Sequence, residues 1–285
     1  MGSGICRRFL EAGARVAAPQ RSNSSLGDAL DELVGLRLAK EQLDTPIIDY
    51  GTPEGAQRLA AHLERAYGRG GVDVVVSCVG GGFAKGRLSE LTPQDVHDAL
   101  GRALPHMLLA QALAPLLREA PSSCYVFVTG MLGEVCSMPG AAALSIANAA
   151  IYGIVRAMEA EFKDRPLRIN EVRTPQAPAA PYTIIQNRCS LGFLNRVCDA
   201  ELPSTGSHAP QLRIAALLRK DSKPGHPFVA DMPAFPATLI GDVAVAVAAG
   251  RQRGEIVRVR AADLEPKMAA YRSRPRESSD ESLEA

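Results

Sequence analysis

The chain has 285 residues, of which 46% are hydrophobic and 22% are charged, and its formal net charge at pH 7 is +1. These values are ordinary for a globular chain of one large domain, and a net charge near zero argues against a nucleic-acid or membrane surface as partner. The six cysteines are scattered without a C-x-x-C pair, and no histidine falls at metal-ligand spacing. We therefore expect buried free thiols in a reducing compartment, the cytoplasm, and no metal site.

The first part of the chain alternates short apolar runs with helical patterns. Strands are predicted at residues 15–19, 45–50 and 72–78, the last before a glycine-rich turn. Residues 25–40 predict an irregular amphipathic helix. Residues 53–68 predict a regular helix, because a proline opens it, apolar residues recur at four-residue spacing and a glycine closes it.

The middle of the chain continues the same alternation. One long helix is predicted at 92–117, beginning at Thr-Pro-Gln-Asp. A strand at 124–128, a helix of small residues at 139–162 and a strand at 167–172 follow it. Strand, helix and strand in this order indicate a parallel α/β unit.

The pattern loosens over residues 176–235, where proline, glycine, histidine and serine are frequent. Loops of this length are usually functional or mobile. A helix at 236–249 and a strand at 255–259 restore the pattern. The tail at 263–285, rich in serine, arginine and glutamate, is expected to be disordered.

The segment 139–162 reads PGAAALSIANAAIYGIVRAMEAEF. It resembles the catalytic helix of the short-chain dehydrogenases/reductases, P-G-x-x-x-Y-S-x-S-K-A-A-x-x-G, which continues to A-x-E-F or E-L. The resemblance covers about residues 1–175 and 236–262. It implies an α/β fold, a Rossmann-like three-layer αβα sandwich with a parallel sheet, over residues 1–262, in which 176–235 form the substrate lid.

The same resemblance locates the catalytic positions, and their residues differ from those of the family. Leu144 takes the place of the tyrosine that transfers the proton, and Asn148 that of the lysine that lowers the tyrosine pKa. Gly130 or Met131 takes the place of the serine that holds the substrate oxygen, and Arg102 that of an active-site asparagine. Four differences together argue against the family's ordinary mechanism.

Two replacements for the missing groups are conceivable. Tyr152 and Arg156 form a tyrosine–cation pair at i, i+4, but using it would slide the helix by eight residues, about 12 Å. We therefore expect Tyr152 to pack on the helix flank. Single side chains near the cleft are the other source of a proton donor. These candidates are Thr129, Glu134, Cys136, Ser137, Ser145 and Arg173.

The resemblance also implies the cofactor contacts. Gly2-Ser3-Gly4-Ile5 corresponds to the second half of the glycine-rich loop that binds the phosphates. Gln20 replaces the acid that holds the ribose of NAD, and Arg21 with Ser22 follows it, which favours NADP over NAD. The remaining contacts implied are Asp49, Tyr50, Cys78, Val79, Gly80, Asn148 and Thr174.

The family places a central strand before the glycine-rich loop, and the sequence has none before Met1. Without it, two neighbouring strands lack a ladder partner. Three explanations are open: a start site further upstream, a truncated chain, or another segment in the vacant position. We expect one of the first two, because no unassigned run rich in valine and isoleucine remains to fill the position.

Two functions follow as hypotheses. The first is an NADP-preferring oxidoreductase that acts on a carbonyl or alcohol of a small molecule by a non-standard mechanism. The second is an inactive relative, a pseudoenzyme that serves as a dimerising scaffold or nucleotide sensor, with or without bound cofactor. Residues 141–155 carry no charge on any face. Such a helix is buried on both sides, so we expect a homodimer or homotetramer formed through it and the helix at 92–117.

Overall fold

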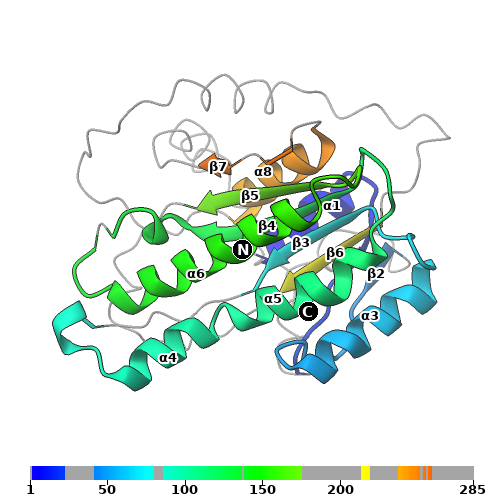
Figure 1. Cartoon of the computed structure of the whole chain (residues 1–285). Coiled ribbons are helices and arrows are strands. Elements are labelled where there is room, and N and C mark those ends of the chain that lie inside the picture. Colours follow the sequence, from blue (N-terminus) through cyan, green and yellow to red (C-terminus); the bar gives the residue numbers. More distant parts are fainter. Residues whose placement is uncertain are drawn as a thin grey trace, which may run out of the picture.

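Seven strands of the described residues form one parallel sheet in the order β2-β1-β6-β3-β4-β5-β7 (Figure 1). The computed structural model describes residues 2–22, 42–79, 86–136, 138–174, 213–218, 237–250, 253–254 and 256–258. The strands are β1 (Arg15–Ala17), β2 (Leu43–Asp44), β3 (Val74–Cys78), β4 (Cys124–Gly130), β5 (Arg168–Thr174), β6 (Arg213–Leu218) and β7 (Ile256–Arg258). The Rossmann-like α/β fold is confirmed.

Helices cover both faces of this sheet (Figure 1). They are α1 (Gly2–Glu11), α3 (Pro53–Tyr67), α4 (Pro93–Gly101), α5 (Leu104–Leu113), α6 (Ala142–Glu161) and α8 (Ala237–Ala249). Short 3-10 helices lie at η2 (Leu88–Glu90), η3 (Ala114–Leu116) and η4 (Met131–Gly133). None of the helices in the described ranges is long and apolar enough to cross a membrane. The helix predicted at 25–40 and the tail at 263–285 lie outside the described residues.

The centre of the sheet holds a strand that the sequence did not assign to it. β6 pairs on one edge with β1, where Ile214 is the partner of Val16, and on the other with β3, where Ala216 is the partner of Val76. This is the position of the family's first strand. The expectation that no other segment fills it is therefore wrong, and residues 213–218 belong to the sheet rather than to a lid.

Two predicted elements differ in extent because of proline. Pro105 lies in the first turn of α5, and its ring excludes the carbonyl four residues earlier, at Gly101, where α4 ends. The single helix predicted at 92–117 is therefore two helices and a 3-10 turn. β2 ends two residues before Pro46, so the strand predicted at 45–50 is reduced to one bridge between Gln20 and Ile47.

The remaining helices agree closely with their sequence signals. The Thr52 hydroxyl accepts the Gly55 amide at the start of α3, and Gly68 ends it with φ of 80°. Such a positive φ costs glycine little. Gly55 itself is required, because a Cβ there would lie 1.7 Å from the Asp49 carbonyl oxygen.

Each face of the sheet has its own core. α3, α5 and α6 cover one face, where Tyr125 and Phe127 of β4 stack with ring centroids 4.6 Å apart. α1 and α8 cover the other face. These two helices approach so closely that a Cβ on Gly241 would lie 2.5 Å from the carbonyl oxygen of Gly4.

A buried arginine fixes α8 against the sheet. The Arg168 guanidinium donates to the Val247 and Ala248 carbonyls in the last turn of α8, and to the Pro121 and Ser122 carbonyls before β4. The last carbonyls of a helix lack partners within it and carry the negative end of its dipole. Arg168 therefore supplies both the donors and the charge that this helix end needs.

The cysteines are free thiols where the structure describes them. Cys6 and Cys124 are buried, and burial raises the pKa of Cys124 to about 11. Cys136 is exposed, which corrects the expectation that the thiols are buried. Cys189 and Cys198 lie outside the described residues.

The position of β6 leads to a stability prediction. Proline cannot donate to the ladder, so Ala216→Pro, between two paired neighbours, should destabilise the fold by roughly 3 kcal/mol or more. Arg258→Pro in β7, which among the described strands pairs with β5 alone, should cost less. Urea unfolding measures both variants. An Ala216→Pro midpoint equal to that of the unaltered chain would show that β6 is not part of the cooperative sheet.

A buried histidine leads to a pH prediction. His106 of α5 accepts or donates a hydrogen bond of 2.8 Å between its Nδ1 and the Ser77 hydroxyl, and burial lowers its pKa from 6.5 to about 4. In the unfolded chain His106 therefore becomes protonated near pH 6.5, whereas in the folded chain it becomes protonated only near pH 4. Falling pH across this window should remove roughly 3 kcal/mol of stability, at about 1.4 kcal/mol per pKa unit.

His106→Asn is the matching variant, since its amide can also bond to Ser77 but does not titrate. The stability gap between the two proteins, measured by urea unfolding, should narrow as the pH falls from 7 to 4. A constant gap would mean that His106 keeps an ordinary pKa.

Candidate functional site

The predicted phosphate loop is the first turn of a helix. Gly2-Ser3-Gly4-Ile5 opens α1, which corrects the expectation of a loop. Gly4 packs against Gly241 of α8, and the Ile5 side chain is buried. The free amides of a helix N-terminus attract phosphate in either arrangement, so phosphate binding by this turn stays a prediction.

The predicted selector residues lie after β1. Gln20 is buried, and its amide donates to the Ala18 carbonyl at 3.1 Å. Arg21 is half-buried and Ser22 is exposed. A Cβ built on Gly51 would lie 3.2 Å from the Asp49 carboxylate and 3.9 Å from an Arg21 nitrogen. The structure therefore brings Arg21 and Asp49 to the same glycine.

The other implied cofactor contacts lie in the segment before α3 and at the ends of β3 and β5. Tyr50 is buried in the core with 1% of its surface exposed. Cys78 is half-buried at the end of β3, where burial raises its thiol pKa, and Val79 after it is buried. Gly80 lies outside the described residues. Thr174 ends β5, and its hydroxyl donates to the Thr129 carbonyl at 2.8 Å.

The turn after β4 packs tightly on the first half of α6. The Ser145 hydroxyl donates to the Leu132 carbonyl at 2.7 Å. A Cβ on Gly133 would lie 2.6 Å from the Ala149 amide nitrogen and 2.8 Å from the Asn148 Cβ. The turn that follows the position of the family's serine therefore packs against Asn148, at the position of its lysine.

The four catalytic positions have different surroundings. Gly130 is buried at the end of β4, and Leu144 is half-buried in the first turn of α6. Arg102 is half-buried at the break between α4 and α5, outside both helices. Asn148 is buried, and its Nδ2 has no hydrogen-bond partner among the residues that the structure describes. A buried donor without a partner is costly and indicates a missing acceptor.

A charged cluster joins the ends of β4 and β5. Arg173 donates to Glu171 at 2.8 Å and to Glu134 at 2.9 Å, and the Thr129 hydroxyl donates to the other oxygen of Glu171 at 2.6 Å. The Arg173 and Glu171 side chains are 6% and 1% exposed, whereas Glu134 is 34% exposed. Burial by itself lowers the pKa of Arg173, but its hydrogen bonds with the two carboxylates raise it above its usual value.

Tyr152 of α6 completes this cluster. The Arg173 guanidinium carbon lies 3.6 Å from the centre of the Tyr152 ring. The Tyr152 hydroxyl donates to the Gly130 carbonyl at 2.5 Å. Arg156, the cation considered from the sequence, is exposed and pairs with Glu159 at 2.6 Å. The cation that pairs with Tyr152 is therefore Arg173 of β5, and not Arg156 in the next turn of α6.

The sequence identified only part of this cluster. Thr129, Glu134 and Arg173 were candidate donors, whereas Glu171 was missed. The available signal was alternation along β5, because residues two apart in a strand share a face, and Glu171 and Arg173 have that spacing. Of the other candidates, Cys136 is exposed and its thiol contacts the Met138 carbonyl at 3.7 Å, and Ser137 lies outside the described residues.

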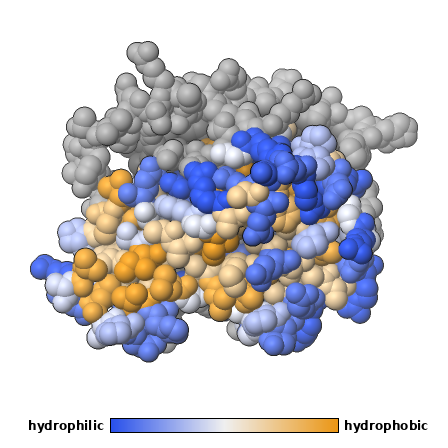
Figure 2. All heavy atoms as spheres, in the orientation of Figure 1, coloured by the Kyte–Doolittle hydropathy of each residue, from blue (hydrophilic) through white to orange (hydrophobic). Residues whose placement is uncertain are grey.

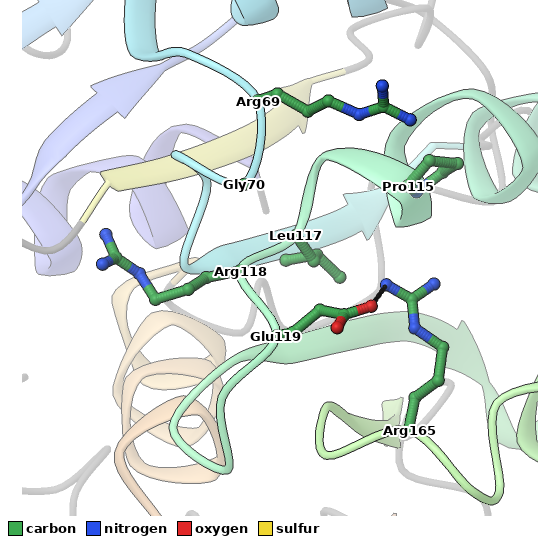
Figure 3. A pocket seen from close by; sticks show the side chains of 7 residues that line it. All are labelled: Arg69, Gly70, Pro115, Leu117, Arg118, Glu119 and Arg165. Carbon is green, nitrogen blue, oxygen red and sulfur yellow. Dashed lines mark hydrogen bonds and ion pairs between the residues drawn. The ribbon is translucent and has the colours of Figure 1, made fainter.

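A hollow of about 620 Å³ lies at the opposite edge of the sheet (Figure 3). It is lined by Arg69, Arg118 and Arg165 on loops that precede β3, β4 and β5. Arg118 pairs with Asp73 and Arg165 with Glu119, both at 2.8 Å. The C-terminal ends of α3 and α6 lie on this edge, and the negative end of a helix dipole favours positive charge nearby. The hollow is separate from the candidate site.

Comparison with known proteins agrees with this geometry. A family model described as enoyl-(acyl carrier protein) reductase matches residues 1–178. A search of curated proteins finds no match. Among solved structures, the chain is similar to the NADPH-bound short chain oxidoreductase from Pseudomonas aeruginosa PAO1 that contains an atypical catalytic center, with 17% identity, 90% of this chain and 89% of that chain covered, and a TM-score of 0.62.

Two further structures show the same fold. A short-chain dehydrogenase/reductase from Serratia marcescens BCRC 10948 is 15% identical over 90% of each chain, with a TM-score of 0.58. A blue fluorescent protein from a metagenomic library, in complex with NADPH, is 18% identical over 90% of each chain, with a TM-score of 0.61. Since the family model spans more than half of the sequence and the fold agrees with it, this chain belongs to the short-chain dehydrogenase/reductase family.

Proposed function

We propose that this protein is an NADP-dependent oxidoreductase that acts on a carbonyl or alcohol group of a small molecule by a non-standard mechanism. Its family and fold support the oxidoreductase class. The observation that carries the proposal is the unpartnered Nδ2 of Asn148, buried on α6 beside the turn that follows β4.

Asn148 fits a nucleotide cofactor by its chemistry. A neutral amide donor can bond to a ribose hydroxyl, as the family's lysine does, although it brings no positive charge. The first turn of α1 would hold the phosphates, and the end of β5 at Thr174 would adjoin the nicotinamide. When bound, the reduced cofactor supplies the hydride.

The residues after β1 support NADP over NAD. Gln20 brings no carboxylate to repel a 2′-phosphate, and its side chain is already used on the backbone. Arg21 is half-buried near Gly51 and supplies a guanidinium that suits phosphate. Two of the similar structures are bound to NADPH, which accords with the same choice.

A second function, an inactive cofactor-binding relative, is favoured by one observation. Four hydroxyl groups at the site are donated within the protein: those of Ser145, Thr129, Thr174 and Tyr152. A protein that binds nucleotide without turnover would have the same arrangement. Consumption of NADPH in the presence of a carbonyl compound distinguishes the two functions, because only the first predicts it.

The proposed cofactor contacts predict a pattern of affinities. Arg21→Ala should weaken NADPH binding by roughly 10- to 150-fold, the loss of about 1.5–3 kcal/mol for a charge-assisted contact, and leave NADH binding unchanged. Asn148→Ala should weaken both nucleotides alike, because both carry the same nicotinamide ribose. Arg58→Ala, an exposed arginine on α3, is the matched control.

Isothermal titration calorimetry with NADPH and NADH measures these constants. Equal affinities of the unaltered protein for the two nucleotides would overturn the preference for NADP. Retention of both affinities in Asn148→Ala would remove the main support for the cofactor site.

The surface of α4, α5 and α6 supports the proposed assembly. Apolar side chains gather on the lower left of the molecule in Figure 2, over α4 and the adjoining part of α6. Leu88, Leu100 and Leu104 are 74%, 48% and 43% exposed. Contiguous apolar surface of this kind marks contacts between proteins, and a second copy of this chain is the partner we propose.

This assembly predicts a change of mass on a single substitution. Leu104→Glu should convert a homodimer or homotetramer at micromolar concentration into monomer, because a carboxylate would be buried in the contact. Ile47→Glu, at an exposed apolar residue after β2, should leave the assembly unchanged. Sedimentation velocity distinguishes the states, and a monomeric unaltered protein would refute the proposal.

A further inference from the structure

The Tyr152 hydroxyl lies at the position of the family's serine, although Tyr152 itself is further along the sequence than the family's catalytic tyrosine. Its Cα lies eight residues after Leu144, or about 12 Å along the axis of α6. Side chains of a helix point back toward its N-terminus. The ring of Tyr152 does so, and its hydroxyl ends on the carbonyl of Gly130, the residue at the serine position.

The surroundings of Tyr152 hold a positive charge against its ring. Arg173 covers the ring at 3.6 Å and is itself held by Glu171 from its own strand and by Glu134 from the turn after η4. On α6, Arg156 and Glu159 pair with each other. The Arg173 guanidinium, held by these two carboxylates, therefore covers one face of the phenol ring. Tyr152 is half-buried, so part of this residue is exposed to solvent.

We propose that Tyr152 is the proton donor of the reaction and that Arg173 positions it. This inference rests on the proposed reductase function. The Gly130 carbonyl holds the hydroxyl at the end of β4, and Arg173 stabilises the charge that forms when the proton leaves. Glu171 and Glu134 fix the guanidinium over the ring, so that Arg173 acts through Tyr152 and not on the substrate.

The step balances with the reduced nicotinamide as reductant. When bound, the reduced nicotinamide would give up a hydride from its C–H bond and become oxidised. The carbonyl carbon of the substrate would accept the hydride, and the π pair of its C=O bond would pass to the oxygen. The Oη–H bond of Tyr152 then breaks, the proton bonds to the substrate oxygen, and the electron pair stays on Oη. A proton from water restores the phenol.

The deciding experiment compares two acceptors that differ in their need for a proton. Trifluoroacetophenone, an activated ketone, needs a hydride and a proton, whereas the 1,2-dimethyl-1-pyrrolinium cation needs only a hydride. Tyr152→Phe keeps the ring under Arg173 and removes the hydroxyl. It should lower kcat/KM for the ketone by roughly 100-fold or more. The value of kcat/KM for the cation should stay within about threefold of that of the unaltered protein. Tyr67→Phe is the control and should change neither.

The outcomes separate this inference from the function on which it rests. Unchanged ketone reduction in Tyr152→Phe would overturn Tyr152 as the donor while the reductase function stands. An equal loss for both acceptors would also overturn it, because a merely structural role has that effect. An unaltered protein that binds NADPH but reduces neither acceptor would overturn the function and this inference together.

A measurement without turnover tests the role of Arg173. The absorbance of tyrosinate is titrated in the unaltered protein and in Tyr152→Phe, and their difference reports the pKa of Tyr152. Arg173→Met should raise that pKa by about one unit or more, because the cation that covers the ring would be lost. Arg173→Lys should restore most of the shift. An unchanged pKa in Arg173→Met would refute the positioning role.

Discussion

A parallel sheet can lose an edge strand and remain paired, but it cannot lose an internal strand. Every backbone amide and carbonyl of an internal strand needs a partner on each side, and unpaired groups buried between two helix layers are costly. In this protein the position between β1 and β3 needs such an internal strand. β6 meets it from the far end of the chain, in parallel register with both neighbours. The two cores and the strand ends that carry the candidate site depend on this pairing.

The pairing of strands in that sheet determines the geometry of the site. β4 and β5 are in register from Cys124 with Arg168 to Gly130 with Thr174, so their ends lie side by side. This places Thr129 beside Arg173 and lets Glu171 bond to both. A buried guanidinium with two carboxylates is tolerated when its hydrogen bonds are well formed, and it constrains the groups around it. Here the constrained group is the ring of Tyr152.

The sequence predicted the elements whose signals are local. α3 has its cap, its proline and its closing glycine within one segment, and the small-residue pattern of α6 is continuous. The break between α4 and α5 was also local, since Pro105 determines it, and was missed because the helical pattern on both sides was read as one. The family resemblance also implied that the turn after β4 lies close to Asn148.

The sequence could not predict what depends on distant pairing. The segment Arg-Ile-Ala-Ala-Leu-Leu of β6 has little intrinsic preference for a strand. Its identity comes from two partners that lie far from it along the chain. The contact of Tyr152 with Arg173 joins a helix and a strand in the same way. Composition and periodicity describe single segments, so these two features appear only when the fold brings the segments together.

Hydrogen exchange read by mass spectrometry tests the central claim, that β6 is the internal strand of the sheet. The free energy of opening should be the same for the amides of residues 213–218 and for those of β3, because both would exchange only through global unfolding. Fast exchange of 213–218, in a protein whose β3 and β4 amides stay protected, would contradict it.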